Sequence, residues 1–124
     1  MIEIKLASPE KLVEICTQLN IESNCHLKIY VAYDGAEELG SCGFQIFGKQ
    51  GSLDFSYMKE ENLRMIEDGL LRSALSLMFE TGVEVAVCGG GVDPRMLKRL
   101  GFQQNGTEYS LTLKDSFLTQ GCGC

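Results

Sequence analysis

Residues 52–102 carry the clearest structural pattern in the chain, and they read SLDFSYMKEENLRMIEDGLLRSALSLMFETGVEVAVCGGGVDPRMLKRLGF. A long helix is predicted at about 62–81, because apolar side chains recur there at helical spacing. They are Leu63, Ile66, Leu70, Ala74, Leu77 and Met78. Asn62 is expected to cap the start of this helix, and Gly82 to adopt the left-handed turn that ends it.

Strands are predicted on both sides of this helix, at 52–58 and 83–88. The second strand, Val-Glu-Val-Ala-Val-Cys, is β-branched and mostly apolar, which is typical of a strand inside a sheet. A strand–helix–strand unit of this length predicts a right-handed crossover between parallel strands. Gly89-Gly90-Gly91 should connect the second strand to a short helix near a ligand cleft. That helix begins at Asp93-Pro94 and ends at Gly101.

The remaining residues add five strands and one helix. The strands are expected at 2–6, 27–33, 38–47, 102–104 and 108–113, and the helix begins at Ser8-Pro9-Glu10. The order β-α-β-β-β-α-β-α-β-β predicts an α/β (mixed α+β) fold, with a central mixed sheet and helices on both faces. We expect a single domain at 1–118 and a flexible tail at 119–124 that carries Cys122 and Cys124.

Composition narrows the class of protein. A chain of 124 residues with 44% hydrophobic and 23% charged residues suits one soluble globular domain. No apolar run approaches the roughly 20 residues that a membrane helix needs. The N-terminus has no secretory pattern, so a cytoplasmic protein without a membrane partner is expected. The formal charge of −6 argues against nonspecific binding of nucleic acid.

Six cysteines are many for a chain of this size. Cys16, Cys25, Cys42 and Cys88 are interpreted as small buried hydrophobic residues. Three interpretations of Cys122 and Cys124 stay open: incidental thiols at a disordered end, a reversible Cys-x-Cys disulfide, or a share of a zinc site. A zinc site would need two further ligands, from Cys25, His26 or a second chain. No metal site is predicted.

The element order and the closing Leu100-Gly101-Phe102 resemble the GNAT (Gcn5-related N-acetyltransferase) family. By motif the resemblance covers residues 53–102. It implies a GNAT-like acyl-CoA N-acyltransferase fold, in which a mid-sheet strand runs into a turn that holds the acyl-CoA pyrophosphate at the start of the long helix. Acetyl-CoA is the cofactor that the resemblance implies.

The resemblance places cofactor-binding residues at the end of the strand 52–58 and in the turn that follows. They are Tyr57, Met58, Asn62, Leu63, Arg64 and Met65, with Gly69 as the close-approach residue if the turn is differently aligned. Met65 stands at a position where the family has glycine, and Glu67 at a position where it has a small residue. We expect Met65 to obstruct the phosphate site, and Glu67 and Asp68 to repel a diphosphate if they face it.

The predicted catalytic residues are Glu38, to attract or deprotonate an amine, with its neighbour Glu37, and Tyr57, whose hydroxyl could contact a ligand. The predicted function is acetyl transfer from acetyl-CoA to a small-molecule or peptide amine, and a homodimer is compatible with the sequence. The alternative is a non-catalytic GNAT-like binding module that has lost CoA binding and uses its thiol tail for metal or redox contact.

Overall fold

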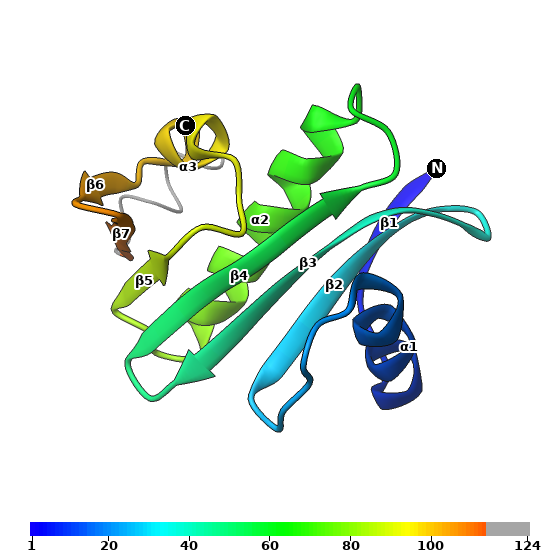
Figure 1. The fold of residues 1–124 in the computed structure, drawn as a ribbon, viewed down its shortest axis with the longest axis horizontal. Coiled ribbons are helices and arrows are strands. Elements are labelled where there is room, and N and C mark those ends of the chain that lie inside the picture. The colour runs from blue at the N-terminus through cyan, green and yellow to red at the C-terminus, as the bar shows by residue number, and fades with distance from the viewer. Residues whose placement is uncertain (114–124) are drawn as a thin grey trace.

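One mixed sheet of seven strands runs through the computed structural model, which describes residues 1–113 (Figure 1). The strand order is β1-β2-β3-β4-β5-β7-β6, and the described strands pair antiparallel except for β4 with β5. The elements are β1 (Ile2–Leu6), α1 (Pro9–Leu19), β2 (Leu27–Asp34), β3 (Glu37–Phe47), β4 (Gln50–Met58), α2 (Arg64–Glu80), β5 (Val85–Cys88), α3 (Pro94–Leu100), β6 (Gln103–Asn105) and β7 (Glu108–Thr112). The predicted fold class and the parallel crossover through α2 are confirmed.

Helices cover both faces of the sheet, with α1 at the front beside β2 in Figure 1 and α2 behind β3 and β4. Behind the sheet, Leu70, Leu71, Ala74, Leu75 and Met78 of α2 are fully buried in the larger core cluster. A smaller cluster on the α1 face contains Ile15, Cys16, Leu27, Ile29 and Val31. Burial of these apolar side chains on both faces is what holds the helices to the sheet.

The helix α2 begins later than predicted. Its N-cap is Leu63, which offers no side-chain acceptor, and the Leu63 carbonyl accepts the N–H groups of Ile66 (3.1 Å) and Glu67 (3.0 Å). The prediction that Asn62 caps the helix is therefore wrong, because Asn62 lies in the preceding turn. At the other end Gly82 has a φ of 97°, as predicted.

The elements after α2 lie within about one residue of their predicted bounds, except that β5 is shorter than the predicted strand 83–88. Val83 and Glu84 lie outside this strand, because their N–H groups donate to Met78 O (2.9 Å) and Lys49 O (2.7 Å). Asp93 caps α3 through its side chain, and Gly101 ends α3 with a φ of 104°. No helix among the described residues is both long and apolar enough to cross a membrane.

Three of the four described cysteines are buried. Cys16, Cys42 and Cys88 confirm the prediction, and burial raises the pKa of the Cys42 thiol to about 12. Cys25 is exposed, so that prediction is wrong; it lies in the turn that precedes β2, where no element covers it. The alternatives for Cys122 and Cys124 concern residues outside the described part of the chain.

Candidate functional site

The parallel strands β4 and β5 are paired over only half the length of β4. Their register runs from Gln50 opposite Val85 to Leu53 opposite Cys88, where β5 ends. The second half of β4 continues alone on this side as far as Met58. Open α/β sheets bind ligands outside the carboxyl ends of such strands, so the space beside the unpaired half of β4 is a candidate ligand site.

A glycine-rich segment closes the corner where β5 leaves β4. The Ser56 N–H donates to Gly91 O (3.2 Å), and a Cβ on Gly91 would overlap the Asp54 carbonyl oxygen. The same Cβ would lie 2.8 Å from Asp54 C, whereas Gly89 and Gly90 have open space. The triglycine therefore lies against the unpaired half of β4, and its third residue fits only as glycine.

Asp54 is an ionisable residue in the middle of the central strand that the sequence analysis missed. Phe44 pairs with Leu53 and Gly43 with Phe55, so Asp54 is the extra residue of a β-bulge. Its carboxylate accepts hydrogen bonds from Gln45 Nε2 (2.5 Å) and Ser52 Oγ (2.9 Å). In the sequence Asp54 occupies a polar position between Leu53 and Phe55 in a regular alternation, so nothing local distinguished it; in the fold it marks a bulge next to the point where β4 and β5 part.

The turn from β4 into α2 exposes free backbone donors. No acceptor within residues 1–113 receives the N–H groups of Arg64 and Met65, the first two residues of α2. Leu63 supplies no capping oxygen. Unpaired N–H groups at a helix start, together with the positive end of the helix dipole, attract anions.

The side chains expected to obstruct this turn point elsewhere. Met65 is 86% exposed, so it lies in solvent and does not fill the turn. Glu67 is 9% exposed and accepts a hydrogen bond from Ser56 Oγ at 2.6 Å, and Asp68 pairs with Arg72 at 2.8 Å. The expected obstruction and repulsion are therefore corrected: packing against β4 turns the Glu67 carboxylate inward.

Two of the predicted cofactor residues have structural roles of their own. A Cβ on Gly69 would approach Ile4 Cδ1 at 3.3 Å, so Gly69 makes its close approach to β1. Met58 packs against the core on the α2 side, where a Cβ on Gly40 would lie 2.5 Å from its sulfur. Ligand contact by either residue stays a prediction.

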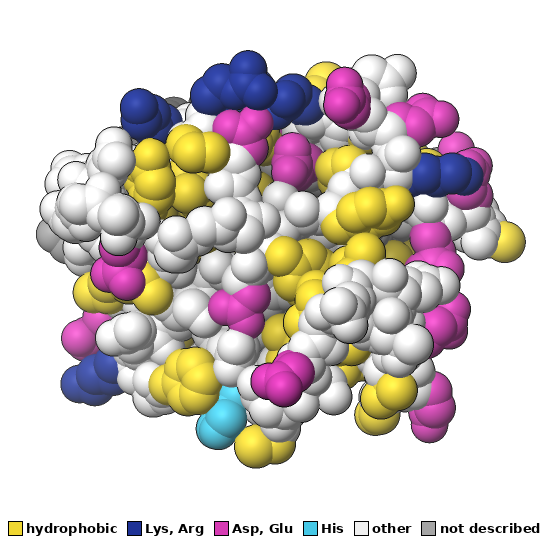
Figure 2. Space-filling view, in the orientation of Figure 1, with side chains coloured by type: hydrophobic (Ala, Val, Ile, Leu, Met, Phe, Trp, Pro, Cys, Tyr) yellow, Lys and Arg dark blue, Asp and Glu magenta, His cyan; other side chains and the backbone are white. Residues whose placement is uncertain are grey.

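Four cationic side chains lie at the start of α2 and along α3. They are those of Arg64, Arg95, Lys98 and Arg99, all on exposed residues, and Figure 2 shows dark-blue side chains gathered along this edge. Asp93 joins the two helix starts, because it accepts from Arg64 Nη1 (3.3 Å) and Arg95 Nη2 (3.0 Å). Within residues 1–113, Lys98 and Arg99 form no salt bridge. We call these four residues the basic cluster; its position beside the free N–H groups suits a phosphorylated ligand.

The junction at Asp93 predicts a dependence of stability on pH. Hydrogen bonds from the Arg95 side chain and backbone, with a smaller effect of Arg64, lower the pKa of Asp93 to about 2. The folded pKa lies below the unfolded value of about 3.9, so the charged form stabilises the fold above pH 4. We expect the stability advantage of the wild type over Asp93→Asn to disappear as the pH falls from about 4 to about 2. Urea denaturation across this range measures it; a constant difference would contradict the assignment.

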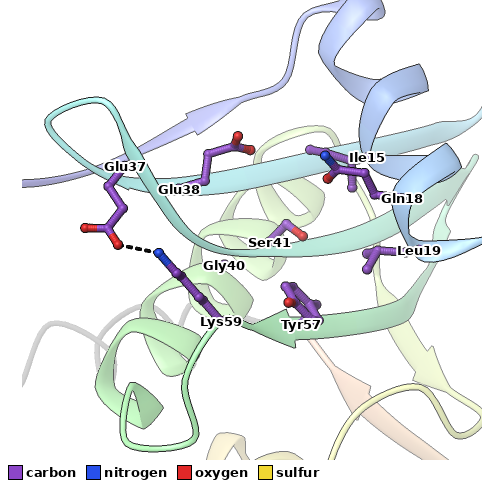
Figure 3. A pocket seen from close by; sticks show the side chains of 9 residues that line it. All are labelled: Ile15, Gln18, Leu19, Glu37, Glu38, Gly40, Ser41, Tyr57 and Lys59. Atoms are coloured by element: carbon purple, nitrogen blue, oxygen red, sulfur yellow. Dashed lines mark hydrogen bonds and ion pairs between the residues drawn. The ribbon is translucent and has the colours of Figure 1, made fainter.

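A cavity of about 380 Å³ lies on the opposite, α1 face of β4 (Figure 3). It is lined by Ile15, Gln18, Leu19, Glu37, Glu38, Gly40, Ser41, Tyr57 and Lys59. Glu38 accepts from Lys11 Nζ at 2.6 Å and Glu37 from Lys59 Nζ at 2.5 Å. The hydrogen bond to Glu38 raises the pKa of the Lys11 ammonium group. We call this space the α1-face cavity.

The structure brings the predicted catalytic residues together. Glu38 and Tyr57, which are 19 positions apart in the sequence, line the same α1-face cavity. Asn62 and Leu63 lie between β4 and α2, and Arg64 and Met65 are the first two residues of α2. His26 lies apart from these groups, with its ring tilted by 45° to that of Phe47 at a centroid distance of 4.6 Å. Among residues 1–113, no group of three or more His, Cys, Asp and Glu side chains is placed to hold a metal ion.

The Ser56–Glu67 hydrogen bond is expected to stabilise the junction of β4 and α2. Ser56→Ala leaves a buried carboxylate without its donor, so we expect a loss of about 2 kcal/mol in the free energy of unfolding. Ser73→Ala is the matched control on α2, because Ser73 Oγ donates only to the Gly69 carbonyl. Chemical denaturation compares the two variants, and equal small losses would show that Glu67 does not depend on Ser56.

Comparison with solved structures assigns the fold. The ribosomal-protein-S18-alanine N-acetyltransferase of Escherichia coli superposes with a TM-score of 0.74, at 11% identity, over 92% of this chain and 95% of that one. A GNAT family acetyltransferase of Brucella melitensis in complex with acetyl-CoA gives 0.72, at 18% identity, over 92% and 89%. Tetrahymena Gcn5 gives 0.70, at 12% identity, over 90% and 96%. The chain has the GNAT fold.

This finding confirms the fold that the resemblance implied. No protein-family model matches the sequence, and comparison with the curated proteins gives no match. The chain therefore shares its backbone topology with these three structures, although the sequence identities are only 11–18%. The matched region covers 89–96% of the length of these three structures.

Proposed function

We propose that this chain is an acyl-CoA-dependent N-acyltransferase that transfers an acetyl group to an amine. The observation that carries the proposal is the start of α2, where two free N–H groups lie beside the basic cluster at the end of β4. An acyl-CoA presents a diphosphate and a further phosphate, and such anions suit these donors. The Brucella melitensis protein, which has the same fold, was solved in complex with acetyl-CoA.

In this proposal the cofactor and the acceptor amine approach β4 from different sides. The phosphates lie against the turn before α2 and the basic cluster, while the acceptor amine enters the α1-face cavity. Tyr57 lines this cavity two residues before Lys59, where the turn begins. A thioester carbonyl held at the unpaired end of β4 is then within reach of an amine from the cavity side.

Acetyl transfer requires the amine to be neutral when it attacks the thioester carbonyl. The nitrogen forms a bond to the carbonyl carbon, the carbon–sulfur bond breaks, and the amine proton must leave. Glu38 is the candidate to attract the ammonium and accept that proton, and the Tyr57 hydroxyl is the candidate donor near the departing thiolate. Asp54 is held by two donors and serves to position the bulge.

Acetyl transfer can be measured by the amine-dependent release of CoA thiol, with mass spectrometry of the product. A panel of primary amines and N-terminal peptides is incubated with acetyl-CoA and the full chain. Loss of general acid or base catalysis by Glu38→Gln or Tyr57→Phe should lower kcat roughly 100-fold. Glu84→Gln, which changes an exposed carboxylate on another part of the surface, is the control. Release that is unaffected by both site variants would remove these roles.

The alternative is a GNAT-like binding module without CoA, and whether acetyl-CoA binds to the full chain distinguishes the two. A cytoplasmic location, a small-molecule or peptide amine as partner, and a homodimer stay predictions.

A further inference from the structure

We propose that β1 is a dimer interface, at which the β1 strands of two copies of this chain pair antiparallel and join their sheets. The inference does not depend on the proposed function. It concerns an edge of the sheet that β2 and β3 separate from β4, the strand of the candidate site.

β1 is the outermost strand on its side of the sheet. Among residues 1–113 it pairs only with β2, and Figure 1 shows it in deep blue at the margin of the sheet. Most of its residues are exposed, and these are Ile2, Glu3, Lys5 and Leu6. The unpaired side of an edge strand presents a row of free N–H and C=O groups, which can pair with a strand of another chain.

The register with β2 determines which backbone groups of β1 are free. The Ala7 N–H donates to Ile29 O (2.8 Å), so these two residues, which continue the register of β1 on β2, form a hydrogen-bonded pair. Such pairs alternate with non-hydrogen-bonded pairs along an antiparallel ladder, so every second residue counted back from Ala7 bonds to β2. The N–H and C=O groups of Ile2, Ile4 and Leu6 therefore point away from β2, toward the open edge.

An antiparallel register centred on Ile4 uses all of these free groups. It places Ile4 opposite the partner's Ile4, and Ile2 opposite the partner's Leu6, as hydrogen-bonded pairs. The two residues of each such pair exchange both of their hydrogen bonds. A register shifted in either direction leaves free groups unpaired at one end of each strand, so the centred register satisfies the edge best.

The charges of β1 favour the same register. Glu3 then lies opposite the partner's Lys5, and Lys5 opposite the partner's Glu3, in the non-hydrogen-bonded pairs, where side chains approach most closely. Both side chains are available, because Lys5 is 61% and Glu3 57% exposed, and they form a salt bridge only with each other, at 3.6 Å. The neighbouring registers would place Glu3 opposite the partner's Glu3, or Lys5 opposite the partner's Lys5, and like charges in such pairs are destabilising.

Pairing in this register also covers apolar side chains that are exposed in one chain. The Ile4 side chain faces α2, because its Cδ1 would lie 3.3 Å from a Cβ on Gly69. Side chains alternate along a strand, so Ile2 and Leu6 lie on the same face as Ile4. Ile2 is 44% and Leu6 49% exposed. The register sets each of them beside the other from the partner, which removes apolar surface from water.

Sedimentation equilibrium of the full chain tests the proposal. As the protein concentration rises from micromolar to millimolar, the mass of the wild type should increase from 13.7 kDa toward twice this value. Glu3→Lys and Lys5→Glu should each raise the dissociation constant of the dimer roughly tenfold, because each variant replaces two attractive pairs by two like-charge pairs. The fold should persist, since both side chains are exposed. The matched controls Glu108→Lys and Lys49→Glu reverse exposed charges outside β1 and should dimerise as the wild type does.

The variant Glu3→Lys/Lys5→Glu tests the register, because exchange of the two charges again places opposite charges across the interface. Its dissociation constant should return to within about threefold of the wild-type value. Amide hydrogen exchange gives a second readout. The N–H groups of Ile2, Ile4 and Leu6 should be protected only at concentrations at which the dimer forms.

Four results would overturn the inference. The first is a chain that stays monomeric at millimolar concentration, which would leave the edge free for a strand of another protein. The second is a dimer that Glu3→Lys weakens no more than Glu108→Lys does. The third is a variant with exchanged charges that dimerises no more tightly than the single variants. The fourth is a dimer in which the amides of Ile2, Ile4 and Leu6 exchange as fast as in the monomer.

Discussion

Gly91→Ala is expected to lower the free energy of unfolding by about 3 kcal/mol, because the added methyl group would overpack against the backbone of β4. A methyl group on Gly91 would overlap the Asp54 carbonyl oxygen and lie 3.0 Å from Phe55 Cα. Neither atom belongs to a flexible side chain, so the segment must move away from β4. That movement also breaks the hydrogen bond from the Ser56 N–H to Gly91 O.

The chain contains its own control for this substitution. Gly90 has no neighbouring atom within 4 Å of a built Cβ, and its φ is not positive. Gly90→Ala should therefore change the stability by less than about 1 kcal/mol, and could raise it by restricting the unfolded chain. Thermal and urea denaturation compare the variants. Equal effects at the two positions would show that the approach of Gly91 to β4 does not hold the corner closed.

The second large effect is expected in ligand binding. Reversal of three charges of the basic cluster, in the variant Arg95→Glu/Lys98→Glu/Arg99→Glu, should weaken acetyl-CoA binding roughly 100-fold. The estimate takes about 1 kcal/mol for each charge contact with a phosphate, which together give about 3 kcal/mol. The fold should survive, because the buried residues of α3 are Met96, Leu97 and Leu100.

A matched control makes the same change of net charge elsewhere. Lys5→Glu/Lys28→Glu/Lys49→Glu alters three exposed lysines outside the basic cluster and outside the lining of the α1-face cavity. Calorimetric titration at low and high salt separates the two variants, because exposed charges are screened within about 10 Å at 0.1 M salt. Equal weakening by both variants would show that net charge, rather than the position of the basic cluster, governs binding.

The sequence predicted the elements whose pattern reflects burial. The helical spacing of Leu70, Ala74 and Met78 and the apolar run 83–88 located α2 and β5, because the same residues form the core behind the sheet. The capping of α3 by Asp93 and the turn at Gly101 were also predictable, since both depend on neighbouring residues only.

Features that depend on contacts between distant residues were not predictable. Asn62 has the side chain of a helix cap, yet the turn between β4 and α2 places the cap one residue later. Glu67 was expected to repel a diphosphate if it faced one, but its carboxylate points inward and accepts a hydrogen bond from Ser56, eleven positions earlier. A bulge at Asp54 leaves no local pattern in the sequence, and neither does a buried serine such as Ser41.

The candidate site was predicted only in part, because some of its features also depend on contacts between distant residues. The turn before α2 follows from the family resemblance, and Glu38 and Tyr57 do share one cavity. The sequence did not indicate the basic cluster, because its members come from two helices that are 14 or more residues apart in the chain and whose starts are linked by the ion pairs of Asp93. It also gave no sign that lysines pair with Glu37 and Glu38, which are 22 and 27 positions away from their partners.

Binding of acetyl-CoA tests the central claim most directly. Titration calorimetry with the full chain should show one site, and differential scanning calorimetry should show stabilisation by about 2.7 kcal/mol at a hundredfold excess over the dissociation constant. The Arg95→Glu/Lys98→Glu/Arg99→Glu variant should lose most of this stabilisation at the same ligand concentration. Absence of both heat and stabilisation at millimolar acetyl-CoA would contradict the acyltransferase account and favour a GNAT-fold binding module without CoA.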